Sequence, residues 1–362
     1  MKASISRRTF IHAAMAAAAA SRPILSSAST PSQKRNMKLG FDNFSIRNMG
    51  WKALQILDYA ASLKVDVVMF SDLDVYESLE ESHLKTVKQK ADQLGIELHA
   101  GTGGVCPTSS RFDDRFGSAE EHLALTIRVA NILGSPVARC YLGSMDDRQN
   151  GDIYKHIEAM AQTCKKVRSR AVDAGVKIAI ENHAGDMQAW ELAMLIEEAG
   201  KDYVGATMDC GNAIWVVEDP MTNLEILGPY AVSSGMRDCA VWASDNGAWT
   251  AWANIGGGHM DWEAYLETYQ RLCPNVPFIL EIISGAQREF PYFNPEFWRQ
   301  FPKAKASQFA RFVAMAHKGE PFQHPADRPF GERSRELTQQ QQKYDLEQSL
   351  KYCKEELGLG MK

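Results

Sequence analysis

Three short apolar segments of this 362-residue chain each end in a carboxylate. Residues 177–180 precede Glu181, residues 206–208 precede Asp209, and residues 277–280 precede Glu281. Buried parallel strands read as continuous apolar runs, and catalytic side chains of barrel enzymes lie where such strands end. Three carboxylates at one rim repel one another unless a cation or shared protons hold them together. The pattern therefore predicts a divalent metal site with these three residues as ligands.

Apolar segments of this kind alternate with amphipathic segments through most of the chain. The expected strands are residues 39–46, 65–71, 96–100, 136–142, 176–181, 204–209, 231–237 and 277–282. The helical patterns between them include residues 51–63, 80–94, 119–133, 154–174, 189–199 and 262–272. Eight strands that alternate with helices form a parallel sheet, and eight close into a barrel. The open, doubly wound alternative lacks its Gly-x-Gly-x-x-Gly turn after the first strand. We therefore predict an α/β fold, a (β/α)8 TIM barrel with a C-terminal helical extension.

The two ends of the chain differ from this barrel pattern. Residues 1–28 resemble a twin-arginine signal peptide, because Arg7 and Arg8 precede a short Ala-rich run and small residues. That run is too short for a stable membrane span. A linker is expected at 29–37 and the barrel with its cap at 38–317. Residues 318–362 read as a polar connector and one amphipathic helix, which docks either on the barrel or on a second subunit. The expected location is the periplasm, reached through the twin-arginine export machinery.

Charge argues against nucleic acid as a partner. The formal net charge of −5 becomes −9 when residues 1–28 are removed, because that segment carries four basic residues and no acidic ones. An acidic protein is a poor ligand for a phosphate backbone. An abasic-site endonuclease would also need a His-rich zinc rim and a basic face. The sequence offers neither, so we expect no nucleic acid partner.

Several motifs resemble those of the sugar phosphate isomerase/epimerase family, within the xylose-isomerase-like barrel superfamily. They are Ile-Glu-Asn-His at 180–183, Met-Asp-Cys-Gly-Asn at 208–212, Met-Arg-Asp at 236–238, Gly-Gly-Gly-His-Met-Asp at 256–261 and Leu-Glu at 280–281. The resemblance covers about residues 38–285. It implies a divalent ion, commonly manganese, bound by a Glu, an Asp, a His and a Glu at strands five to eight.

Glu181, Asp209 and Glu281 match three of these ligand positions, but Gly235 stands where relatives have the His. His259, in the loop after the seventh strand, is the expected replacement, with water or substrate as the alternatives. Oxygen ligands favour manganese, with magnesium or cobalt as other candidates. The resemblance further implies that Glu181 and Glu281 are the acid/base pair. The expected substrate-binding residues are His99, Arg139, His183, Asn212 and Arg237, each with a purely structural role as the alternative.

The sequence therefore predicts a metal-dependent isomerase or epimerase acting on a sugar or keto-sugar through an enediolate. Two alternatives stay open. One is a lyase or dehydratase that removes a β-substituent from a keto-sugar or keto-glycoside after the same proton abstraction. The other is a non-catalytic sugar-binding barrel. The expected partner is a small carbohydrate, and self-association into a homo-oligomer is left open.

Overall fold

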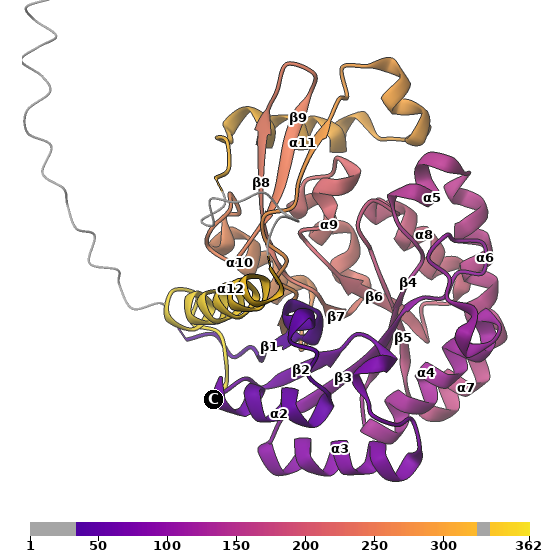
Figure 1. Cartoon of the computed structure of the whole chain (residues 1–362). Coiled ribbons are helices and arrows are strands. Elements are labelled where there is room, and N and C mark those ends of the chain that lie inside the picture. The colour runs from indigo at the N-terminus through magenta and orange to yellow at the C-terminus, as the bar shows by residue number, and fades with distance from the viewer. Residues whose placement is uncertain (1–33, 324–333) are drawn as a thin grey trace, which may run out of the picture. The chain divides into compact units, whose positions relative to one another are not determined.

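The computed structural model describes residues 34–323 and 334–362 (Figure 1). Within these residues, eight strands form one parallel sheet in the order β10-β1-β2-β3-β4-β5-β6-β7. Their bounds are β1 Leu39–Asp42, β2 Val67–Phe70, β3 Glu97–Gly104, β4 Val137–Tyr141, β5 Lys177–Glu181, β6 Val204–Met208, β7 Ala231–Ser234 and β10 Phe278–Leu280. A parallel bridge between Met236 and Leu280 joins the segment after β7 to β10. The sheet therefore closes, and the predicted TIM barrel is confirmed.

Helices follow the strands and pack on the outside of the sheet. They are α2 (Ala53–Ser62), α3 (Glu81–Leu94), α4 (Ala119–Leu133), α5 (Met145–Asn150), α6 (Ile153–Lys166), α7 (Arg168–Ala174), α8 (Ala189–Ala199), α9 (Pro220–Leu227) and α10 (Trp262–Leu272). The turns into β3 and β5 use Gly95 and Gly175, whose φ values of 64° and 66° are left-handed. Glycine adopts this conformation without a Cβ clash, so both helices end there.

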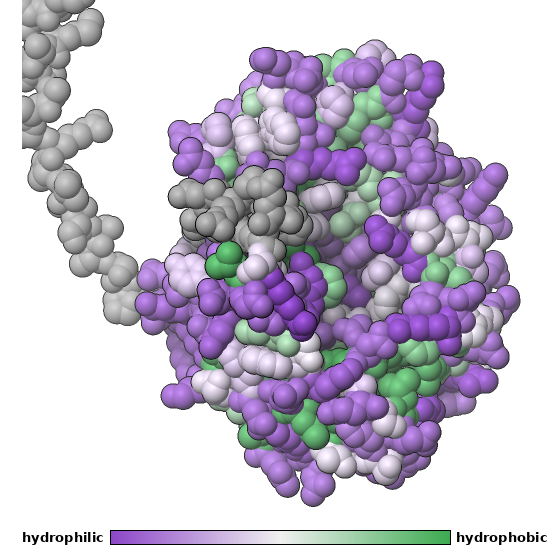
Figure 2. All heavy atoms as spheres, in the orientation of Figure 1, coloured by the Kyte–Doolittle hydropathy of each residue, from purple (hydrophilic) through white to green (hydrophobic). Residues whose placement is uncertain are grey.

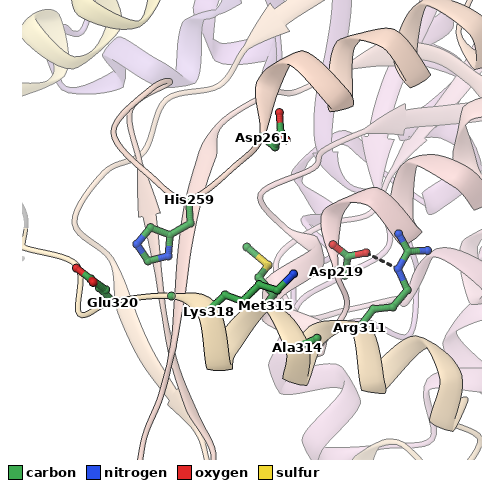
Figure 3. A pocket seen from close by; sticks show the side chains of 9 residues that line it. Asp219, His259, Asp261, Arg311, Ala314, Met315, Lys318 and Glu320 are labelled. Atoms are coloured by element: carbon green, nitrogen blue, oxygen red, sulfur yellow. Dashed lines mark ion pairs between the residues drawn. The ribbon is translucent and has the colours of Figure 1, made fainter. Parts of the chain in front are cut away.

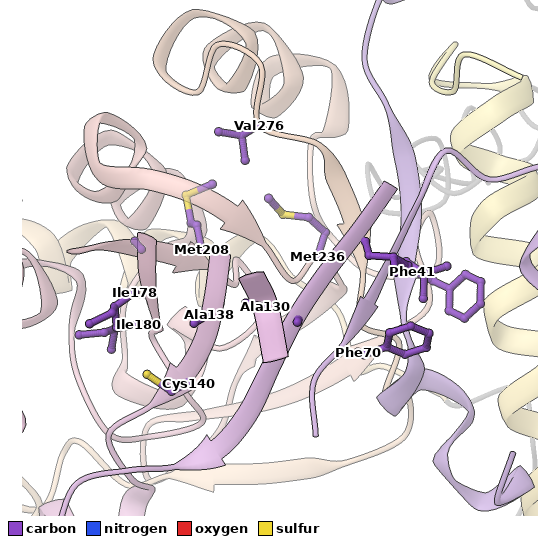
Figure 4. Close-up of a cluster of buried hydrophobic side chains, with 14 of the residues drawn as sticks. Phe41, Phe70, Ala130, Ala138, Cys140, Ile178, Ile180, Met208, Met236 and Val276 are labelled. Atoms are coloured by element: carbon purple, nitrogen blue, oxygen red, sulfur yellow. The ribbon is translucent and has the colours of Figure 1, made fainter. Parts of the chain in front are cut away.

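Alternate residues of each strand face the two sides of the sheet. Phe41, Phe70, Ala138, Ile178 and Ile180 belong to the main core between sheet and helices (Figure 4). The intervening residues form a small cluster inside the barrel, which contains Val67, Met69, Val137, Ala179 and Ile279. Because side chains alternate with a period of two, the residues two positions after Val137, Ala179 and Ile279 also face the barrel interior. This register directs Arg139, Glu181 and Glu281 into the barrel mouth.

A second, antiparallel sheet follows β7. It consists of β8 (Asp238–Ala243), β9 (Ala248–Ala253) and β11 (Gln287–Phe290), in the order β11-β9-β8. The helices η6 (Pro295–Gln300) and α11 (Ala306–Lys318) follow β11, and Figure 1 shows α11 lying beside β8 and β9. Val241, Trp252, Phe290 and Phe312 contribute to a second core in this layer. The sequence predicted one strand at 231–237; the structure has a shorter strand, β7, which is followed by the hairpin of β8 and β9.

Helix α12 (Arg335–Glu355) completes the ring of barrel helices. It packs against η1 (Asn43–Met49), β1 and β10, and its Leu346, Leu350 and Cys353 belong to the main core. Beyond the helix, the Gly360 N–H donates to Met37 O at 3.0 Å. The sequence left open whether this helix docks on the barrel or on a second subunit, and in the structure it packs on the barrel. The boundary predicted between the barrel and the C-terminal extension, at residue 317, therefore separates α12 from barrel strands with which it shares one core.

None of the helices in residues 34–323 and 334–362 combines the length and the apolar character needed to cross a bilayer. Hydrophilic residues dominate the face of the molecule shown in Figure 2, where apolar residues form small separate groups.

Leu346→Ala should lower the free energy of unfolding by about 2–5 kcal/mol, because it leaves a cavity in the core under α12. Leu346 is fully buried, whereas Leu337 on the same helix is 41% exposed. Urea unfolding of Leu346→Ala and of the control Leu337→Ala measures the difference. Equal, small losses in both variants would contradict the packing of α12 against the barrel.

Candidate active site

The three predicted carboxylates meet at the carboxyl ends of the strands. Glu181 is the last residue of β5, while Asp209 and Glu281 directly follow β6 and β10. One carboxylate oxygen from each lies within 4.8 Å of the other two, and all three residues are buried. Such proximity raises the energy of the ionised forms unless positive charge lies nearby.

Two arginines supply that positive charge. Arg139 Nε donates to Glu181 Oε2 at 2.7 Å, its Nη2 bonds the same oxygen, and its Nη1 donates to Thr102 O at 2.9 Å. Arg237 Nη2 bonds Asp209 Oδ2 and lies 3.1 Å from Glu281 Oε2. The structure thus brings both predicted arginines to the carboxylate cluster, and we define that cluster as Glu181, Asp209 and Glu281.

Asn212 links two of the carboxylates. Its Nδ2 donates to Glu181 Oε1 at 3.1 Å and to Asp209 Oδ2 at 2.9 Å, and its backbone N–H donates to Asp209 Oδ1 at 3.0 Å. Asn182 ties the ends of β5 and β6 together: its Nδ2 donates to Asp209 O at 2.7 Å and its Oδ1 accepts the Asp209 N–H at 2.9 Å. Asn212 therefore fixes the orientation of two carboxylates, and Asn182 fixes the backbone from which the Asp209 side chain projects.

His183 lies beside the cluster as a neutral base. Its Nδ1 lies 2.6 Å from Gly143 O, and a carbonyl only accepts, so Nδ1 carries the proton and Nε2 is left as an acceptor. The ring stacks on Tyr141 with centroids 4.0 Å apart. Burial and the charge of Arg139 lower the pKa of His183 to about 4. At neutral pH the side chain can accept a hydrogen bond from a hydroxyl.

The structure places His99 elsewhere. Its Nε2 lies 3.0 Å from Glu97 Oε1 and its Nδ1 lies 2.9 Å from Ser233 Oγ, so its two nitrogens bond to β3 and β7 inside the barrel. Glu97 is the first residue of β3, and Ser233 lies within β7. The predicted role of His99 in substrate binding therefore has no counterpart in its hydrogen bonds.

His259 is not brought to the carboxylate cluster either. Its Nδ1 accepts the Val241 N–H at 3.3 Å, and its ring lines a separate cavity of about 670 Å³ with Asp219, Arg311 and Lys318 (Figure 3). The physical reason is the carboxylate of Asp238, which accepts N–H groups on both sides of His259. These donors are the Gly256 N–H at 2.9 Å and the Met260 N–H at 3.2 Å. The loop is thereby held against β8, and the expected fourth metal ligand is absent from the cluster.

Asp42 is a buried carboxylate at the same rim that the sequence reading missed. It ends β1 and accepts hydrogen bonds from Ser71 Oγ at 2.6 Å and from the Phe44 N–H at 2.8 Å. Burial and the nearby charge of Glu281 raise its pKa well above the ordinary value. The signal was present, because Leu39-Gly40-Phe41-Asp42 is another apolar run that ends in a carboxylate.

The two glutamates differ in their affinity for protons. Burial raises the pKa of Glu181 to about 7, against the lowering effect of Arg139. Burial also acts to raise the pKa of Glu281, but Arg237 and Arg139 outweigh it, so that pKa falls below its ordinary value. Pairs of carboxyl groups whose environments separate their pKa values are typical of acid/base sites.

The carboxylate cluster fits a divalent cation. Its donor atoms are all hard oxygens, which suit manganese or magnesium. Within the described residues, Glu281 Oε2 is buried and has no aligned hydrogen-bond donor, although Arg237 lies within ion-pair distance. A Cβ added to Gly235 would lie 3.3 Å from this oxygen and 3.6 Å from Asp209 Oδ2. A side chain at 235 would therefore point into the cluster, and glycine leaves that position open.

Comparisons with known proteins agree with this architecture. The 3-oxo-isoapionate decarboxylase of Pectobacterium atrosepticum is 21% identical over 230 residues, which span 63% of this chain and 75% of the decarboxylase. A structure of D-psicose 3-epimerase in the presence of D-fructose superposes with a TM-score of 0.60 at 15% identity, covering 89% of this chain and all of the epimerase.

A 3-keto-D-glucoside 4-epimerase from E. coli superposes with a TM-score of 0.53 at 11% identity, covering 74% of this chain and all of that enzyme. At these identities the solved structures support the fold alone. The family model described as xylose isomerase-like TIM barrel matches residues 57–300. Because that match spans more than half of the sequence, the chain belongs to the xylose isomerase-like TIM barrel family.

Proposed function

We propose that this protein is an isomerase or epimerase that moves a proton at a carbon next to the carbonyl of a sugar or keto-sugar. The observation that carries the proposal is the convergence of Glu181 and Glu281, from strands on different sides of the barrel, on one buried cluster. Two carboxylates that flank one carbon can remove a proton from one face and return it to the other. Similar proteins that are epimerases support the same reading.

The metal belongs to this proposal. Glu181, Asp209 and Glu281 would hold a divalent ion, with manganese as the first candidate and magnesium or cobalt as others. When bound, such an ion polarises a carbonyl and makes the neighbouring C–H more acidic. The oxygen-only donor set supports it, as does Glu281 Oε2, which is buried and has no aligned hydrogen-bond donor among the described residues.

The residues of the chain divide the remaining work. Glu281 takes the proton from carbon, which leaves an enediolate, and Glu181 delivers a proton to complete the reaction. Arg139 and Asn212 hold the two oxygens of Glu181, so its position is fixed before substrate arrives. His183 accepts a hydrogen bond from a sugar hydroxyl through Nε2, because its Nδ1 is committed to Gly143 O. Fixed groups lose little freedom during reaction, which favours turnover.

A lyase is the second candidate. The same proton abstraction followed by loss of a β-substituent gives an unsaturated product. The similarity to a decarboxylase favours this alternative, because decarboxylation also passes through an enolate-like state. The two reactions share every residue named above and differ in product.

We also propose that the protein is exported to the periplasm by the twin-arginine machinery. The supporting signal, Arg7 and Arg8 before an Ala-rich run, lies outside the described residues.

Asp209→Ala should remove the metal from the purified mature protein. Asp209 offers one of the three carboxylates that the described residues bring within metal-binding distance of one another, so its loss leaves too few ligands to retain the ion during purification. Elemental mass spectrometry of wild type and variant measures the content, and Asp245→Ala, at an exposed hairpin position, is the matched control. Near-stoichiometric metal in wild type and control, lost in Asp209→Ala, is expected. Wild-type protein that holds no divalent ion, and takes up none when manganese is added, would remove the metal from the proposal.

The reaction type needs its own assay. Incubating keto-sugars with the protein in D₂O should label the carbon next to the carbonyl, which NMR detects. Labelled epimer without unsaturated product identifies the epimerase, and an unsaturated product identifies the lyase. Binding without label or product in either direction would contradict both enzymatic candidates.

A further inference from the structure

The two arginines of the site are held very differently. Arg139 donates through all three of its guanidinium nitrogens, to Glu181 and to Thr102. Arg237 reaches the carboxylate cluster through Nη2 alone, and its buried Nε has no partner within the described residues. A buried donor without a partner costs free energy, so this position of Arg237 is the less satisfied of the two.

Two glycines make the room that Arg237 occupies. A Cβ on Gly211 would overlap Arg237 Cγ and would lie 2.8 Å from Arg237 Cδ. A side chain at Gly235 would approach Glu281 Oε2 and Asp209 Oδ2, the same two oxygens that Arg237 Nη2 contacts. Neither glycine has a left-handed backbone, so their lack of a side chain is not explained by backbone conformation. Gly211 therefore leaves room for the Arg237 side chain, and Gly235 leaves space beside the two oxygens that the guanidinium contacts.

We propose that Arg237 is the resident counter-cation of the carboxylate cluster and must leave Asp209 and Glu281 before a divalent metal binds there. The inference rests on the metal site of the proposed function. A guanidinium and a divalent ion would otherwise contact the same two oxygens, and two cations at that separation in a buried site repel strongly. Only molecules in which Arg237 has left the site bind the metal. The apparent metal affinity is therefore the intrinsic affinity multiplied by the fraction of such molecules.

The structure also offers a support along which Arg237 can move. Its guanidinium carbon lies 4.6 Å from the centroid of the Trp252 ring. Trp252 is itself held in place, because its Nε1 donates to Gly211 O at 2.8 Å and its ring stacks on Trp215 at 4.5 Å. A cation on an aromatic face keeps a favourable contact when it slides or turns. Arg237 can thus release the carboxylates without losing all of its partners.

Calorimetric titration of metal-free protein with Mn²⁺ tests the proposal. Arg237→Gln removes the competing cation, and Gly211→Ala displaces its side chain while the charge remains. Both should bind Mn²⁺ at least about tenfold more tightly than wild type. Gly103→Ala is the matched control, because an added Cβ there would meet only Tyr141, its hydroxyl at 3.4 Å and its Cζ at 3.9 Å, so its affinity should equal that of wild type.

Three results would overturn the proposal. Equal or weaker binding by Arg237→Gln shows that Arg237 does not compete with the metal, while metal binding by wild type would leave the proposed function intact. Tighter binding by Arg237→Gln but not by folded Gly211→Ala shows a general charge effect without displacement. Absence of Mn²⁺ binding in every protein ends both this inference and the metal part of the proposed function.

A second readout follows the arginine directly. Adding Mg²⁺, which is not paramagnetic, should change the tryptophan emission of wild type as the guanidinium moves over Trp252. The change should be largely lost in Trp252→Phe and in Arg237→Gln. An unchanged wild-type emission at saturating Mg²⁺ would contradict movement of Arg237.

Discussion

Glu281→Gln should lower the rate of proton exchange at the substrate carbon by about 10²–10⁴-fold, the usual loss when a positioned acid or base is removed. The amide keeps the size of the side chain but cannot accept a proton from carbon. Glu181→Gln should lower the rate of epimer formation by a similar factor, because Glu181 returns the proton, while exchange through Glu281 continues. The measurements are deuterium incorporation from D₂O and epimer formation, made at a manganese concentration at which each variant has been shown to be loaded.

Glu218→Gln is the control for both variants. Glu218 is as buried as Glu181, but it bonds the Ala189 N–H and Asn223 instead of the carboxylate cluster. Its exchange rate should match wild type. Undiminished exchange in Glu281→Gln, or undiminished epimer formation in Glu181→Gln, would remove that residue from the catalytic pair.

Arg148→Ala should destabilise the fold by about 3–5 kcal/mol, because it leaves a buried carboxylate without its counter-charge. Arg148 pairs with Glu191, and both side chains are almost inaccessible to solvent. Arg148 also donates through Nε to Asp186 O at 2.8 Å and through Nη1 to Gln300 O at 2.8 Å. One side chain therefore joins α5, α8 and the end of η6, which follow β4, β5 and β11.

Urea unfolding measures this loss, with Arg168→Ala as the control. Arg168 pairs with Asp202, and the two side chains are 51% and 57% exposed. Removal of an exposed pair of this kind should cost no more than about 1 kcal/mol. Equal losses in the two variants would show that burial of the Arg148–Glu191 pair has no special weight. The double variant Arg148→Met with Glu191→Leu should recover much of the stability.

The strand ends were predictable because their signal is local. Continuous apolar runs mark the strands, and Glu181, Asp209 and Glu281 follow such runs directly. The alternation of side chains along a strand then determines which residues face the barrel interior. Asp42 carries the same signal but was missed, because the expected strand was extended to residue 46. The structure ends β1 at Asp42, whose side chain accepts the Phe44 N–H and so begins the helix η1.

Other features depend on contacts between distant segments. The hairpin of β8 and β9 had a partial local signal, Asn246-Gly247 between aromatic segments, which is typical of a tight turn. The placement of His259 had none: it depends on Asp238, whose carboxylate fixes the loop against β8. The bonds of Arg237 also depend on the space left by Gly211 and Gly235, which no spacing rule reveals.

The closure of the barrel has a consequence for the order in which the chain is synthesised. Ser45 Oγ donates to Leu280 O, 235 residues away, and the Asn48 N–H donates to Gln342 Oε1, 294 residues away. β1 therefore obtains one of its two neighbouring strands, β10, only after the intervening strands and helices have been made. Until then β1 is an open sheet edge, which readily pairs with other chains. The barrel therefore closes only after residues 278–280 have been made, and a nascent chain exposes that edge until then.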